Sequence, residues 1–353
     1  MSFTLLSSHD PLDHVLPHRF GKPLVHWDIE WTSPLDIVAI HPHDTYFTNQ
    51  LLMTLVAAGL LLLVMTLVGR RYTAMAGGGV ERCVPTGFAG AIEGIMAFLR
   101  NSVAQPVLGD KADRFMPFLW TAFFYILTCN LLGMVPLDGI IHLVSGGSLQ
   151  HIGGTATGNI MITAGLAACA FLMIHVSGTQ EIYTALVNGT YGHHHHEEAS
   201  GGLSHHEAHG HHVGMSPVSA VMAAPILYLW NFAPHVFKPD RIEGVGSVVL
   251  LIADFVMWVG LLILEMIGAV IKPFALAIRL FANMVAGHVV LASILALIFV
   301  FKGSVTANYG LGIVSAVGAA ALSLLELFVA FLQAYVFVFL TTLFIGASVS
   351  PEH

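Results

Sequence analysis

The chain has little charge and almost no cysteine for its length. Only 10% of its 353 residues are charged, against roughly 25% in soluble domains, and the mean hydropathy is +0.78. Its three scattered cysteines fit neither a disulfide framework nor a zinc site. It has no basic surplus to bind nucleic acid and no G-x-x-x-x-G-K-[ST] motif to bind a nucleotide. We therefore expect a polytopic membrane protein without a catalytic site or cofactor of its own.

Apolar runs divide the first half of the chain. Residues 1–47 form a polar arm, in which four charged side chains and three prolines within the first 25 residues argue against a cleavable signal peptide. Apolar spans are predicted at 48–69, 115–136 and 158–183, so that residues 48–183 hold three membrane helices. Between the first two, apolar residues recur at helical spacing in 80–114, which predicts an amphipathic helix on the membrane surface.

The distribution of basic residues predicts the topology. Six Lys or Arg residues lie in 70–114 and none in 137–157. The positive-inside rule places the first of these loops in the cytoplasm and the second outside. The N-terminus is then outside, although Arg19 and Lys22 count against this, and the C-terminus is cytoplasmic.

The second half of the chain differs in kind. A His-rich cytoplasmic loop is predicted at 184–216, and a proline-interrupted interfacial or re-entrant piece at 217–247. Residues 248–353 are almost continuously apolar and would exceed the roughly 30 Å hydrocarbon core as upright helices. We expect two long, strongly tilted helices folded back at 302–310. The predicted fold is thus all-α, with about five membrane helices and one surface helix.

A single arginine stands inside the longest apolar run. Arg279 is the one formally charged residue between Lys272 and Lys302. An arginine at this depth costs between about 3 and 17 kcal/mol, and it cannot escape by losing its proton. The alternative to a functional role is a structural tie to backbone carbonyls or to lipid phosphate.

Other polar residues come into register with Arg279 across the expected fold-back. If the turn is centred near residue 306, Arg279 lies level with Gln333, and His288 lies close to Glu326. Asn283 follows Arg279 by one helical turn and shares its face. Because His and Glu both exchange protons near neutral pH in a suitable environment, the second pair is a candidate proton relay. Its alternative is a plain interhelical hydrogen bond. For Asn130 and Asn159, near the ends of apolar spans, we expect either helix caps or interhelical hydrogen bonds.

These motifs resemble a known family. The segment KPFALAIRLFANMVAGH (272–288) is similar to the signature of subunit a of the rotary F-type ATP synthase, and TCNLLGMVP (128–136) and ELFVAFLQAYVFVFL (326–340) support the resemblance. The resemblance covers about 45–183 and 245–353. It implies that Arg279 is the essential arginine, with Asn283 and Gln333 nearby.

The resemblance also implies roles and partners. His288 and Glu326 match two positions where the family holds His and Glu in either order, and Glu265 matches an acidic position of the cytoplasmic half-channel. The implied partner is a c-ring of small hairpin subunits, whose carboxylates exchange protons with two half-channels separated by Arg279. The same resemblance implies that the chain contacts peripheral-stalk b subunits and, indirectly, the F1 sector. It also implies a location in a bacterial inner membrane.

The His-rich loop suggests a rival function. Residues 192–212 hold nine histidines and three glutamates, and tracts of this kind bind metals loosely. A weak candidate metal site is thus formed by His193, His194, His195 and His196. The alternative is that this stretch is a solvated linker that binds no metal. A metal-cation transporter would need His or Asp pairs one turn apart inside the spans, and none is found. A non-catalytic channel or scaffold would not explain the two polar registers.

Overall fold

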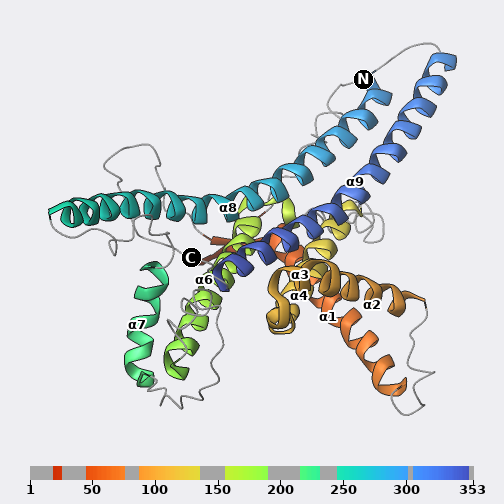
Figure 1. The fold of residues 1–353 in the computed structure, drawn as a ribbon. Helices are drawn as coiled ribbons and strands as arrows, with labels where there is room; N and C mark the ends of the chain where they lie inside the picture. The colour runs from red at the N-terminus through yellow and green to blue at the C-terminus, as the bar shows by residue number, and fades with distance from the viewer. Residues whose placement is uncertain are drawn as a thin grey trace. The chain divides into compact units, whose positions relative to one another are not determined.

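The described part of the chain is almost entirely helical. In the computed structural model it comprises residues 19–25, 45–75, 87–135, 156–189, 215–230, 245–300 and 305–349. Five helical segments in it are long and apolar enough to cross a membrane, at Asn49–Tyr72, Phe88–Met134, Ile160–Asn188, Ile252–Leu291 and Gly312–Val349. The predicted all-α membrane fold is confirmed (Figure 1).

A small sheet is the part of the fold that the sequence analysis missed. Strand β1 (Arg19–Val25) pairs antiparallel with β2 (Thr45–Thr48), with Arg19 opposite Thr48 and Phe20 opposite Phe47. The irregular register between Phe20 and Val25 explains why no clean alternation marks these strands. The expected polar arm thus contains local structure directly before the first membrane helix.

The chain divides into two compact units. The first contains residues 1–166 and 276–339, and the second contains 167–275 and 340–353. The division cuts α6 (Ile160–Asn188), α8 (Val245–Val300) and α9 (Val305–Val349). In α8 the cut falls two residues after Pro273, whose ring removes one backbone hydrogen bond from the helix.

The first unit is built around α4 (Ala112–Met134). Its buried face carries the largest enclosed side chains of this unit, among them Phe115, Met116, Leu119, Phe123 and Ile126. Helix α1 (Asn49–Met75) packs its N-terminal half on α4, where Met53 and Ala57 meet Cys129. The fully buried Asn130 donates to the carbonyl oxygen of Ala330 on α9 (3.3 Å) and accepts from Thr157 (3.0 Å). Of the two roles expected for Asn130, the structure shows the interhelical hydrogen bond, which joins α9 to α4.

The expected amphipathic segment is a broken helix. It runs as α2 (Phe88–Phe98), a π-helical turn (Leu99–Ala104), α3 (Gln105–Leu108) and a 3₁₀ turn (Gly109–Lys111) into α4. Gly109 has φ of 54° and lets the chain reverse there. Its position on the membrane surface stays a prediction.

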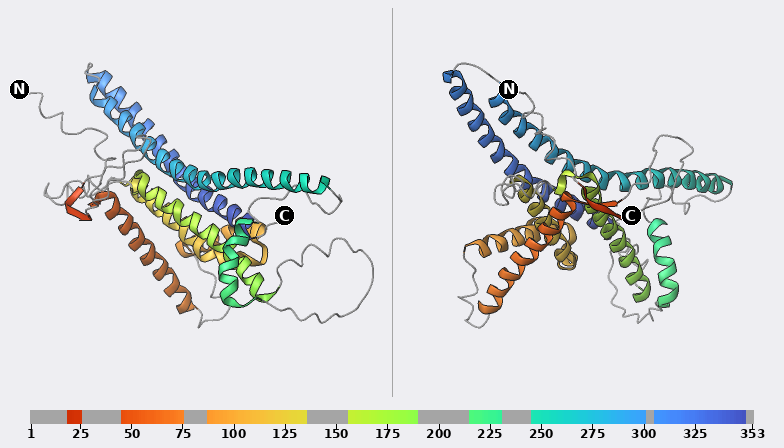
Figure 2. Two further views of the ribbon diagram at one scale, coloured as in Figure 1. Left: turned by 90° about the vertical axis from the view of Figure 1, so that its left-hand side faces the viewer. Right: turned by 180° about the vertical axis from the view of Figure 1, so that it is seen from behind.

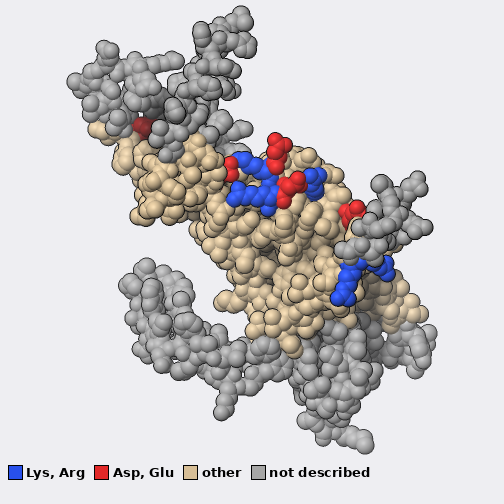
Figure 3. All heavy atoms as spheres, turned by 90° about the horizontal axis from the view of Figure 1, so that it is seen from below, with Lys and Arg blue, Asp and Glu red and all other residues tan. Residues whose placement is uncertain are grey.

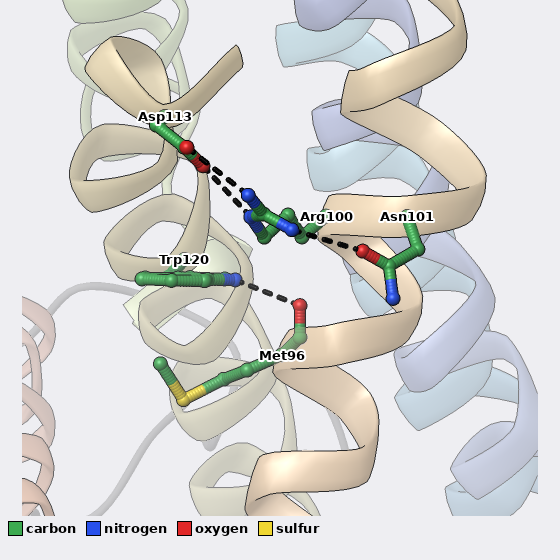
Figure 4. A network of polar contacts seen from close by, with 5 residues as sticks. All are labelled: Met96, Arg100, Asn101, Asp113 and Trp120. Carbon is green, nitrogen blue, oxygen red and sulfur yellow. Dashed lines mark hydrogen bonds and ion pairs between the residues drawn. The ribbon is translucent and has the colours of Figure 1, made fainter.

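Polar contacts join this segment to α4. Arg100 donates to both carboxylate oxygens of Asp113, at 2.7 and 3.0 Å, and the Trp120 indole donates to the carbonyl oxygen of Met96 at 3.1 Å (Figure 4). Figure 3 shows acidic and basic side chains close together on a face whose other described residues are uncharged. The bidentate pair specifies how the two helices align, although exposed ion pairs add little stability.

Helices α8 and α9 form the long antiparallel hairpin that the sequence predicts. They contain 56 and 45 residues, or about 84 and 68 Å of helix. Their parts in the first unit run alongside each other (Figure 2). The predicted turn at 302–310 is too long, because α9 already begins at Val305. Asn308 and Gly310 are therefore helical, which an apolar environment favours because it leaves no backbone group unpaired.

The second unit docks a short helix on α6. Helix α7 (Pro217–Trp230) has 14 residues, about 21 Å, which is short of a membrane span. Ala220 and Ala224 pack against Ile182 and Leu186 of α6. Pro217 occupies the start of the helix, where its missing N–H costs nothing. Pro225 was expected to break this segment, but the helix continues through it.

Two side-chain hydrogen bonds complete the docking of α7. The His175 ring shares a hydrogen bond of 2.9 Å with the Tyr228 hydroxyl, and the Trp258 indole on α8 donates to the carbonyl oxygen of Trp230 at 3.3 Å. These contacts make α7 a packed element of the second unit.

Candidate functional site

Arg279 lies on an exposed face of α8 in the first unit. Leu276, Leu280 and Met284 follow one another at a spacing of four and are at most 5% exposed, so they form the packed stripe of the helix. Arg279 is exposed, as is Asn283 one turn later. Among the residues that the structure describes, none forms a hydrogen bond or ion pair with the guanidinium group. Within the described residues, the charge therefore lies on the exposed side of α8, opposite the packed stripe of the helix.

Gln333 contacts Arg279 from the facing helix α9. Its side chain is 5% exposed, and its Nε2 donates to the Arg279 backbone carbonyl oxygen at 2.9 Å. The amide therefore holds the backbone of α8 at this point and leaves the guanidinium alone. Arg279 and Gln333 are thus close together, as predicted, but the contact is made by the Arg279 backbone and not by its guanidinium group.

Glu326 lies on α9 against the backbone of α8. A Cβ atom at Gly287 would lie 2.5 Å from Glu326 Oε1, so any larger residue there would require the Glu326 side chain to move. That oxygen is buried and has no hydrogen-bond partner among the described residues. The expected pairing with His288 stays a prediction, because the His288 side chain lies outside the described residues although its backbone belongs to α8.

The two contacts share one register. Residues 279 and 333 are symmetric about 306, and residues 287 and 326 are symmetric about 306.5. The register predicted from polar residues alone thus agrees with the structure, although the helix boundaries do not. The sequence analysis did not single out Gly287. Its position next to His288, and opposite Glu326 in the predicted register, could have indicated this contact.

The remaining candidates are placed separately. Glu265 is exposed on α8 in the second unit. His193, His194, His195 and His196 lie outside the described residues. Within the described ranges, no group of three or more His, Cys, Asp or Glu residues is placed to hold a metal ion.

Comparison with known proteins gives the family. Residues 51–193 and 212–346 match the ATP synthase A chain family. The chain belongs to this family. It is 36% identical over 309 residues to ATP synthase subunit a of Chloroherpeton thalassium, covering 88% of this chain and 68% of that protein. It is 31% identical over 340 residues to ATP synthase subunit a 2 of Prosthecochloris aestuarii, covering 96% and 80%.

Family membership confirms the resemblance drawn from the motifs. The two matched regions contain Arg279, Asn283, Gln333 and Glu326, and they include the described contacts between α8 and α9. The chain is an integral membrane component of an ATP synthase.

Removing the Gln333 amide tests its contact with Arg279. We expect Gln333→Leu to lower ATP-driven proton pumping severalfold, because the hydrogen bond to the Arg279 carbonyl, worth about 0.5–1.5 kcal/mol, no longer positions that stretch of α8. Pumping is measured by dye quenching in inverted membrane vesicles. The exposed Gln105 provides the matched control, and Gln105→Leu should pump normally. Equal pumping by the two variants would count against a positioning role for Gln333.

Proposed function

We propose that this chain is the stationary proton-translocating subunit of a rotary ATP synthase. It offers two aqueous half-channels to carboxylates on a c-ring, and Arg279 separates them. The observation that carries the proposal is the exposed guanidinium on an apolar helix, with no partner among the described residues. A charge of this cost in a bilayer calls for a compensating group, and an acidic residue on a neighbouring rotor is such a group.

The chemistry of the guanidinium suits this task. It stays protonated in any environment, and it favours the ionised form of a carboxylate that comes near. A ring carboxyl approaching Arg279 therefore releases its proton into one half-channel before it passes. The fixed positive charge also repels protons, which prevents a direct leak between the half-channels.

The other residues take complementary roles in the proposal. Glu326 and His288 relay protons on the outer side, and Glu265 serves the cytoplasmic side. Gln333 positions the backbone at Arg279, and Asn283 adds a polar group on the same exposed face. The close approach of Glu326 to Gly287, directly beside His288, supports the first of these assignments.

Partners and orientation complete the proposal. The protein partners are the c-ring, the peripheral-stalk b subunits and, indirectly, the F1 sector. ATP chemistry takes place in the partners of this chain. The chain lies in the bacterial inner membrane with its N-terminus outside and its C-terminus in the cytoplasm. Residues 48–183, 217–247 and 248–353 are its membrane-associated parts. The predicted His-rich loop at 184–216 lies in the cytoplasm, and its first residues continue α6 as far as Asn188.

Purification of the complex tests this function. Solubilisation in a mild detergent and capture of this chain should recover a ring of small hairpin subunits in stoichiometric amount. Recovery of the chain without such a ring, but with a tightly bound transition metal, would instead support the metal-transporter alternative.

A further inference from the structure

An apolar groove lies between α1, α2 and α4 in the first unit. Its volume is about 360 Å³, and its lining is almost wholly apolar. Helix α1 contributes Leu60, Leu61, Val64 and Met65, α2 contributes a row from Phe88 to Ile95, and α4 contributes residues between Phe124 and Val135. This groove is separate from Arg279 and from the contacts of Gln333 and Glu326.

A basic cavity adjoins the groove. It measures about 450 Å³, shares Val64 and Phe88 with the apolar groove, and is also lined by Arg70 and Arg71. Both arginine side chains are exposed. The Tyr72 hydroxyl donates to Glu93 Oε2 at 2.9 Å and so joins α1 to α2 close to this basic end. The two cavities thus adjoin at Val64 and Phe88, so that the apolar lining lies next to two arginines.

The groove and the basic cavity together match one leaflet of a bilayer in length. Leu60 and Arg70 are ten residues apart on α1, which corresponds to about 15 Å of helix, half of the roughly 30 Å hydrocarbon core. In the N-terminal half of α1, by contrast, Met53 and Ala57 pack directly against Cys129 of α4. A transmembrane helix of a partner would need the full depth of the membrane. An acyl chain needs only half of it and ends in a headgroup at the interface.

We propose that this groove binds an anionic phospholipid. Its acyl chain lies between α1, α2 and α4, and its headgroup phosphate lies against Arg70 and Arg71. The charge of the arginines complements the phosphate, for which their donor geometry is well suited, and anionic headgroups are attracted by basic residues at the membrane surface. The bound lipid fills the space between the diverging parts of α1 and α2 and so supports the first unit.

Photolabelling of the intact purified complex tests this site. The probe is phosphatidylglycerol carrying a diazirine on one acyl chain, and phosphatidylcholine with the same chain is the neutral comparison. After irradiation, peptides of this chain are mapped by mass spectrometry. We expect phosphatidylglycerol to label residues 60–65, 88–95 and 124–135 in preference to phosphatidylcholine.

Variants separate the headgroup from the acyl chain. Arg71→Gln should reduce the preference for phosphatidylglycerol about fivefold, the effect of one basic residue at an anionic surface, whereas Arg71→Lys should retain it. Ala91→Phe fills the groove and should reduce labelling by both lipids. Ala97→Phe is the matched control, because Ala97 is exposed on the same helix but does not line the groove.

Two results would overturn the proposal. One is equal labelling of the groove by both lipids with no change in Arg71→Gln. The other is protein in place of lipid: a photo-crosslinking amino acid at Leu61 that attaches to a partner subunit would show that a polypeptide occupies the groove.

Discussion

Replacing Arg279 with alanine is expected to abolish coupled proton transport. Without the permanent charge, ring carboxyls keep their protons as they pass, and nothing repels protons between the half-channels. ATP synthesis and ATP-driven pumping should both fall to background in membrane vesicles. Arg279→Lys should also fail largely, because an ammonium group can lose its proton in an apolar site, whereas a guanidinium cannot.

The control for this variant is an arginine of similar exposure elsewhere in the first unit. Arg114 is exposed at the start of α4, where its guanidinium lies 5.7 Å from the centre of the Phe115 ring. Arg114→Ala should leave pumping intact. Normal ATP-driven pumping in Arg279→Ala would refute the proposed role of the arginine, and assembly of each variant is checked by recovery of the ring with the chain.

Replacing Glu326 with leucine is expected to have the next largest effect. A positioned acid or base contributes typically about 10²–10⁴-fold to a proton transfer, so we expect passive proton conduction to fall by about 10² or more. It is measured in vesicles stripped of the F1 sector, under an imposed potential. The reason lies in the buried Oε1 of Glu326, which lies against Gly287, the residue that precedes His288.

A swapped variant distinguishes proton exchange from packing. If the two groups act as a relay, His288→Glu combined with Glu326→His should recover part of the conduction that Glu326→Leu loses. Glu181→Gln on α6 removes a carboxylate outside the proposed path and should conduct normally. A swapped variant no better than Glu326→Leu, or full conduction in Glu326→Leu, would contradict the relay.

The register of the hairpin could be predicted from sequence because polar groups in a membrane need partners. Arg279 and Gln333 stand out in apolar runs, and this restricts how two helices can align. The apolar runs themselves marked α1, α4 and α6. These features depend on side-chain chemistry, which the sequence contains directly.

Other features depend on backbone geometry that no single residue type marks. The glycine at 287 is recognisable as a contact point only once α9 lies against it. Helix α7 continues through Pro225 because the packing of α7 on α6 outweighs the low helix propensity of proline. The same holds for the direction of the Gln333 amide: register places it beside Arg279, but only the structure shows that it bonds to the Arg279 backbone and not to the guanidinium group.

The most direct test of the account asks what lies against the exposed face of Arg279. A benzoylphenylalanine in place of Ile278, which is 40% exposed beside Arg279, is irradiated in the assembled complex. Leu62 on α1, 68% exposed, is the matched control position. We expect Ile278 to yield adducts with a small hairpin subunit of the ring and Leu62 to yield none. Adducts only with lipid or with this chain itself at Ile278 would contradict the account.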